Sequence, residues 1–175
     1  MKAWKIEDYI YIMENLRQVN VFFDDDFHKK YNSFYKVRRN ADWRKIYFNF
    51  LENNKLRNDL TFEEVLKYIY NETGFIEASF ASKLLATINP NMPIWDKNVL
   101  NYFKIKFYAK KTTNKIDLSI KVYDDLCIEY KKMLEDQQVL DEIKRLKGLI
   151  ENYSITNTKI LDFMIWTLGD KMDLE

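Results

Sequence analysis

The sequence predicts an all-α fold, a multi-helix bundle in a single domain. Apolar residues make up 47% of the 175 residues, and they recur mostly at the three- and four-residue steps of helices with one buried face. Three glycines and two prolines leave few positions for the tight turns of a many-stranded sheet. A chain of this length can bury one sizeable core, so we expect one helical domain over residues 1–175.

Start and stop signals divide the first half of the chain into four predicted helices. Each signal is a polar side chain that can accept hydrogen bonds from the free N–H groups of a first turn, or a glycine that can end a last turn. An amphipathic pattern within residues 4–16 opens the chain, and later helices begin after Asp24–Asp26, at Asn40 and at the capping box of Thr61, with Gly74 ending the fourth.

The second half contains three further helical patterns. Apolar residues at helical spacing predict two long helices, from Ile120 to Leu134 and from Leu140 to Ile150. The last pattern, from Ile160 to Leu168, is apolar nearly all round. We therefore expect this final helix to be buried.

Charge and cysteine content limit the function classes. Lysine and arginine number 28 and aspartate and glutamate 27, for a net charge of +1, so nucleic-acid binding must come from local patches rather than a global field. Cys127 is the only cysteine and His28 the only histidine, and we expect neither a disulfide nor a metal or other cofactor. No apolar run approaches the ~20 residues of a membrane span. We expect a cytoplasmic protein without a membrane partner.

Two basic clusters are candidate phosphate-contacting surfaces. One is interleaved with aromatic residues and the other is the densest basic run in the chain. The same residues also fit a solvated helix face or a frayed helix end whose lysines complement the negative pole. The predicted nucleic-acid-binding residues are Lys36, Arg38 and Arg39 in the first cluster, and Lys104, Lys106, Lys110 and Lys111 in the second.

The segment from Gly74 to Phe103 is the part of the chain that suggests chemistry. Its pattern predicts a helix, a turn at Asn89–Pro93 where the two prolines break helical geometry, and a second helix. Asp96 directly precedes the apolar periodicity of that second helix. This is the position of a helix N-cap, which an aspartate side chain fills well.

The string Pro93-Ile94-Trp95-Asp96-Lys97-Asn98-Val99 fits a Pro-Ile-x-Asp-x-Asn-Val loop at each fixed position. Upstream, Ser79-Phe80-Ala81 and Leu84-Leu85 fit a Ser-x-Ala start followed by an aliphatic pair. With these strings, residues of about 62–103 resemble the helix-hairpin-helix and aspartate loop of the base-excision DNA glycosylase superfamily. The adenine-specific mismatch glycosylases are the most similar branch.

The resemblance implies a fold, an activity and a set of site residues. It implies binding of double-stranded DNA and hydrolysis of an N-glycosidic bond, with Asp96 as the catalytic carboxylate. Ser79 stands where bifunctional members hold a Schiff-base lysine, which implies a monofunctional enzyme. The iron–sulfur cluster of some members needs four cysteines, so none is expected here. The implied substrate-binding residues are Ser79, Lys83, Trp95, Lys97 and Asn98.

The hairpin turn departs from the family pattern. Where the family has Gly-x-Gly, this chain keeps only Gly74 and continues with Phe75-Ile76-Glu77, which adds bulk and a negative charge. Two non-catalytic alternatives are therefore also considered. In one, Asp96 is a helix cap on an inert DNA- or protein-binding scaffold; in the other, the chain is a protein-binding helical domain that uses its aromatic surface.

Overall fold

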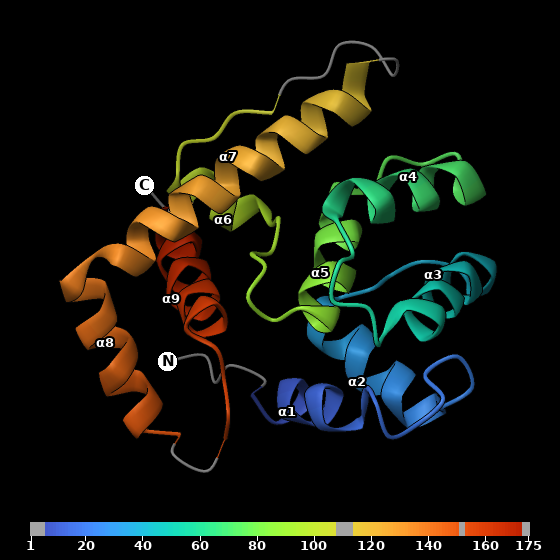
Figure 1. The fold of residues 1–175 in the computed structure, drawn as a ribbon, viewed down its shortest axis with the longest axis horizontal. Helices are drawn as coiled ribbons and strands as arrows, with labels where there is room; N and C mark the ends of the chain where they lie inside the picture. The colour runs from blue at the N-terminus through green and yellow to red at the C-terminus, as the bar shows by residue number, and fades with distance from the viewer. Residues whose placement is uncertain (1–5, 108–113, 151–152, 173–175) are drawn as a thin grey trace. The chain divides into compact units, whose positions relative to one another are not determined.

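The computed structural model describes residues 6–107, 114–150 and 153–172, and over these ranges the protein is all-helical, as predicted (Figure 1). The described residues form nine helices and no strand. The helices group into two compact units, Met1–Ile88 and Asn89–Glu175, and each is described by itself. The single 175-residue domain expected from chain length stays a prediction.

The first unit holds five helices. They are α1 (Ile6–Asn15), α2 (Asp25–Tyr35), α3 (Ala41–Asn54), α4 (Phe62–Thr73) and α5 (Ala78–Ile88). In this unit α1 packs on α2, α4 packs on α5, and α3 contacts both α4 and α5. Four residues, 74–77, connect α4 to α5. They lie where the sequence predicts the hairpin turn.

The predicted caps at Asn40, Thr61 and Gly74 are confirmed. Asp24, predicted as one of three acidic residues at a helix start, is the N-cap of α2, and Asp25 and Asp26 lie in its first turn. The Asp24 side chain accepts a hydrogen bond from the Phe27 N–H at 2.7 Å, and Asn40 does the same for the Trp43 N–H at 2.9 Å. Thr61 begins α4 with a complete capping box. Gly74 ends α4 with φ 73°, a left-handed conformation that glycine adopts without a steric cost.

Buried tyrosines form the core of the first unit. The Tyr47 hydroxyl donates to the carbonyl of Phe80 at 2.9 Å, and it lies 2.9 Å from the Tyr31 hydroxyl. A hydroxyl carries one proton, so Tyr31 must be the donor to Tyr47. Burial raises the pKa of both tyrosines well above its usual range. The chain of hydroxyls thus joins α2, α3 and α5 while staying protonated.

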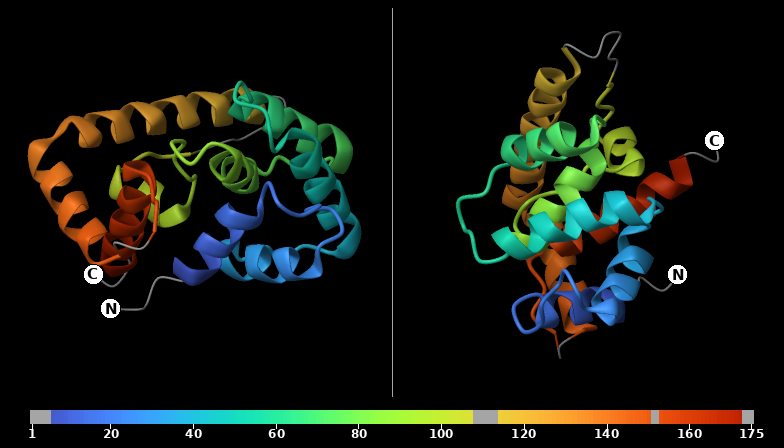
Figure 2. Two further views of the ribbon diagram at one scale, coloured as in Figure 1. Left: turned by 60° about the horizontal axis from the view of Figure 1, so that its bottom comes forward. Right: turned by 90° about the vertical axis from the view of Figure 1, so that its right-hand side faces the viewer.

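The second unit holds α6 (Lys97–Tyr102), α7 (Lys115–Glu135), α8 (Gln137–Gly148) and α9 (Asn157–Met172). Asp136 ends α7 and also caps α8, where its side chain accepts from the N–H groups of Gln138 and Val139. In Figures 1 and 2, α7 and α8 meet at a bend, and α9 lies inside it. Both long helices were predicted from periodicity.

The last helix differs from its predicted character. It packs on α6, α7 and α8, and most of its apolar side chains are buried as expected. However, it also buries Thr158, Lys159 and Asp162, which the apolar pattern did not indicate. None of the described helices is long and apolar enough to cross a membrane.

Gly74 and Gly148 provide a matched pair for testing the helix ends. A Cβ at either position meets nothing within 4 Å, but only Gly74 has a positive φ. We expect Gly74→Ala to lower the free energy of unfolding by about 1 kcal/mol, because alanine is strained at this φ. In contrast, Gly148→Ala in α8 should raise it by up to about 1 kcal/mol. Urea denaturation measures both, and equal signs would contradict the Gly74 geometry.

Candidate functional site

The predicted site residues fall in both units. Ser79 and Lys83 lie on α5 of the first unit, whereas the string from Trp95 to Asn98 lies at the start of α6 in the second. The basic clusters divide in the same way, with Lys36, Arg38 and Arg39 in the first unit and Lys104 and Lys106 in the second. Lys110 and Lys111 lie outside the described residues.

A basic-aromatic cluster forms in the first unit around the turn between α4 and α5. We define it as Arg39, Phe75, Phe80 and Lys83, which are joined by cation–ring contacts, together with Lys36 and Arg38, which adjoin Tyr35 and Arg39 in the sequence. The Lys83 ammonium donates to the Tyr35 carbonyl at 3.2 Å and lies 5.2 Å from the Phe80 ring centroid. The Arg39 guanidinium lies 5.7 Å from the ring centroids of both Phe75 and Phe80, within range of a cation–π interaction. Basic residues of two separate stretches are thus brought together.

Glu77 is the acidic member of this region. Its carboxylate forms an ion pair with the Arg39 guanidinium, and it is one of the three residues that follow Gly74 in this turn. The pair offsets the charge of Arg39 and fixes the guanidinium against the neighbouring rings. Lys36, Arg38 and Lys83 still give the cluster an excess of positive charge over this one carboxylate.

Lys36 and Lys104 share an unusual backbone conformation. Among the described residues they are the two non-glycine positions with positive φ, 55° and 54°. Lys36 directly follows α2, and its N–H and that of Val37 both reach the Asn32 carbonyl. Lys104 lies two residues after the last residue of α6, and the Lys104 and Ile105 N–H groups reach the carbonyls of Asn101 and Leu100. Glycine is the usual residue here, since a Cβ costs roughly 1–2 kcal/mol. Both positions instead carry lysines of the predicted phosphate-contacting clusters.

Asp96 is the N-cap of α6, as predicted. Its backbone is extended, with φ −134° and ψ 154°, and its Oδ1 accepts a hydrogen bond from the Asn98 N–H at 2.9 Å. The side chain is half-buried, and Lys97 beside it is exposed. Asn98 contacts Asp96 through its main-chain N–H. The second carboxylate oxygen of Asp96 is not used by the cap.

Trp95 lies in the core of the second unit rather than on its surface. It is buried and packs edge-on against Phe107, with ring centroids 5.2 Å apart. Its implied substrate-binding role stays a prediction. In this structure the ring anchors the aspartate loop.

A buried network beside this loop was not predicted from the sequence. The Asp162 carboxylate on α9 accepts from the Lys159 ammonium at 2.9 Å and from the Tyr130 hydroxyl of α7 at 2.5 Å. It also lies 3.5 Å from the Ile94 N–H. Lys159 is only 1% exposed and Asp162 6%. The available signal was a lysine and an aspartate three residues apart at the start of the mostly apolar part of a helix.

The same helices hold the proline-rich segment before Asp96. The Tyr123 hydroxyl of α7 donates to the Pro93 carbonyl at 2.9 Å, and the Thr156 hydroxyl donates to the Pro90 carbonyl at 2.7 Å. Burial and the negative charge of Asp162 raise the pKa of both Tyr123 and Tyr130. These hydroxyls therefore stay protonated donors, and the loop that carries Asp96 is fixed on α7 and α9.

Comparison of the chain with protein-family models, with characterised proteins and with solved structures gave no match. The likeness to the glycosylase aspartate loop thus rests on the residues of the loop and the preceding helix. In the described residues, no group of three or more His, Cys, Asp and Glu side chains is arranged to hold a metal ion.

Replacing Lys159 tests the buried network. We expect Lys159→Met to lower the free energy of unfolding by about 3–5 kcal/mol, because it leaves the Asp162 carboxylate buried without its cation. The control is Lys132→Met on α7, which removes an exposed pair with Glu129 of the same i,i+3 spacing. That change should cost only about 0–1 kcal/mol.

The double variant Lys159→Met/Asp162→Leu separates the charge from the packing. It should recover part of the loss, because no unpaired charge is left in the core. Thermal and urea unfolding measure all three variants. Equal losses in Lys159→Met and Lys132→Met would contradict the buried pair.

Proposed function

We propose that the protein binds double-stranded DNA and hydrolyses an N-glycosidic bond, with Asp96 as the reacting carboxylate. The observation that carries this proposal is the setting of Asp96. Its loop is held by the Tyr123 hydroxyl of α7, the Thr156 hydroxyl just before α9 and the Asp162 carboxylate of α9. The N-cap bond uses one carboxylate oxygen of Asp96 and leaves the other for a substrate. A negative charge fixed in this way can stabilise the positive charge that develops on the sugar in the transition state.

The proposed chemistry follows from the properties of a fixed carboxylate. As the base leaves with the electron pair of the glycosidic bond, the sugar becomes positively charged and the Asp96 carboxylate stabilises it. A water molecule then adds to the sugar carbon, and its proton passes through the carboxylate to the base anion, which restores the charge of Asp96. Ser79 has no amine for a Schiff base, so the product is an abasic site without strand cleavage.

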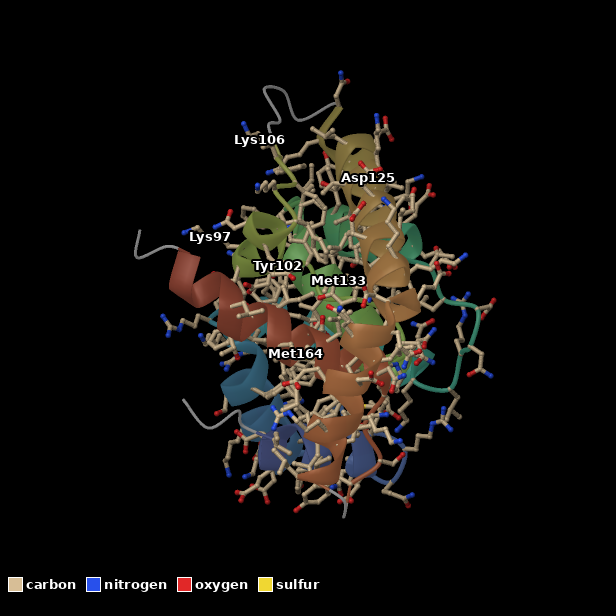
Figure 3. All side chains as sticks on the ribbon, turned by 90° about the vertical axis from the view of Figure 1, so that its left-hand side faces the viewer. Lys97, Tyr102, Lys106, Asp125, Met133 and Met164 are labelled. Carbon is tan, nitrogen blue, oxygen red and sulfur yellow. The ribbon has the colours of Figure 1, made fainter. Side chains whose placement is uncertain are left out.

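DNA binding is supported by the backbone at Lys36 and Lys104. Both lysines occupy strained positions that glycine fits better, and such outliers concentrate at functional sites. Figure 3 places Lys97 and Lys106 along one edge of the second unit, and both are exposed. A row of exposed cations beside the aspartate loop suits contacts to a phosphate backbone.

One observation favours a second candidate, a non-catalytic DNA- or protein-binding module. Capping α6 is a sufficient structural role for Asp96, since its Oδ1 satisfies the Asn98 N–H. In this alternative the scaffold binds a partner and the carboxylate has no chemical role. A cytoplasmic location stays a prediction under both candidates.

Substituting Asp96 separates the two candidates. Asparagine caps helices about as well as aspartate, so Asp96→Asn should keep the stability of the fold, whereas Asp96→Ala should lose about 1 kcal/mol. Without a negative charge, Asp96→Asn should release base from mismatched or damaged duplexes at least ~100-fold more slowly. Base release is measured as abasic sites formed. Equal rates in wild type and Asp96→Asn would remove the catalytic role.

Replacing the two strained lysines by glycine should move stability and binding in opposite directions. Lys36→Gly and Lys104→Gly should each raise the free energy of unfolding by up to about 1 kcal/mol, because glycine relieves the positive φ. Each should also weaken duplex DNA binding. The slope of log affinity against log salt concentration should become less steep by about 0.9, the value for one lost phosphate contact.

Lys132→Gln is the control for these variants, because Lys132 is exposed on α7 outside both basic clusters. It should leave the salt dependence unchanged. DNA titrations at several salt concentrations give these values. Glycine variants that gain stability and bind as the wild type does would argue against a phosphate contact at these positions.

A further inference from the structure

Phe75 is an exposed aromatic residue on an ordered turn. Its side chain is 58% exposed, and it follows Gly74 in the connection between α4 and α5. The Phe75 N–H donates to the Thr73 hydroxyl oxygen at 3.1 Å, and that hydroxyl donates to the Ile69 carbonyl at 2.6 Å. The turn therefore has a defined backbone, and it presents the ring to solvent.

A cation lies beside the ring of Phe75. The Arg39 guanidinium lies 5.7 Å from the ring centroid, and its ion pair with Glu77 holds it there. Arg38 directly precedes Arg39, and Lys36 lies three residues before it; both are exposed. A planar apolar face bordered by cations matches a ligand that combines flat rings with phosphates.

Phe23 shows that exposure of a phenylalanine alone does not create this setting. It is even more exposed, at 75%, and lies in the same unit. Its sequence neighbours are acidic, however, because Asp24, Asp25 and Asp26 follow it directly. Phe23 is therefore unsuited to an anionic ligand and serves as a natural control.

We propose that Phe75 is a stacking site for an unpaired nucleobase, with Lys36 and Arg38 contacting the adjoining phosphates. This inference rests on the proposed DNA binding and adds how the hairpin turn takes part in it. The family turn uses small residues to approach a phosphate, whereas this turn offers an aromatic face braced by Arg39. An acidic peptide would use the cations but leave the ring in water, so a strand with exposed bases fits better.

The test uses a short fluorescent oligo(dT) and a matched strand of abasic sugar-phosphate units. To exclude hydrolysis, all variants carry Asp96→Asn. Phe75→Ala should bind oligo(dT) about tenfold more weakly, within the range for loss of one stacked base. Its affinity for the abasic strand and the salt dependence of binding should not change. Phe75→Trp should bind oligo(dT) at least as well as the parent, and Phe23→Ala should bind equally.

Three results would overturn this inference. They are equal oligo(dT) binding by Phe75→Ala and the parent, an equal loss for the abasic strand, and polyglutamate binding that matches oligo(dT) and depends equally on Phe75. Circular dichroism checks that each variant keeps its helices. Because base release is assayed separately with Asp96 intact, failure of the stacking site leaves the proposed hydrolysis standing, and absence of base release leaves the stacking site standing.

Discussion

The buried carboxylate of Asp162 is the interaction on which the second unit depends. It comes from α9, and it is bonded by a lysine of the same helix, a tyrosine of α7 and, at longer range, the main chain of the aspartate loop. A charge at this depth is tolerated only when its hydrogen-bonding capacity is satisfied. Three segments far apart in sequence are therefore held in one arrangement, because displacing α7 or the loop would remove a hydrogen bond from that buried charge.

The first unit uses uncharged groups for the same purpose. Tyr31 and Tyr47 share a buried hydrogen bond, and Tyr47 continues it to the Phe80 carbonyl. Neutral hydroxyls cost less to bury than a charge, and aromatic rings supply large apolar area around them. The high aromatic content thus mainly serves the core, while Phe75 remains exposed at the turn.

The helices could be predicted because their signals are local. Thr61 with its capping box, Asn40 and Asp96 each act within one turn, so the residues that form the hydrogen bond are neighbours in the sequence. Asp162 could not be assigned in this way, because Tyr130 and Ile94 are distant in the chain and only the fold brings them together. The left-handed backbone of Lys36 and Lys104 could not be predicted either, because a lysine in the sequence does not indicate a positive φ. The sequence therefore predicted the position of Asp96 at a helix start. It did not predict the side chains of α7 and α9 that hold its loop.

The loop from Pro90 to Ile94 is held by groups outside it, and two of the contacts use its main chain as the acceptor. The acceptors of the Thr156 and Tyr123 hydroxyls are the carbonyls of Pro90 and Pro93. Every amino acid has such a carbonyl, so the side chains at these positions can change during evolution while the path of the loop persists. The information for that path lies on α7 and just before α9. The path of this loop therefore depends on the hydroxyls of Tyr123 and Thr156 as well as on its own prolines.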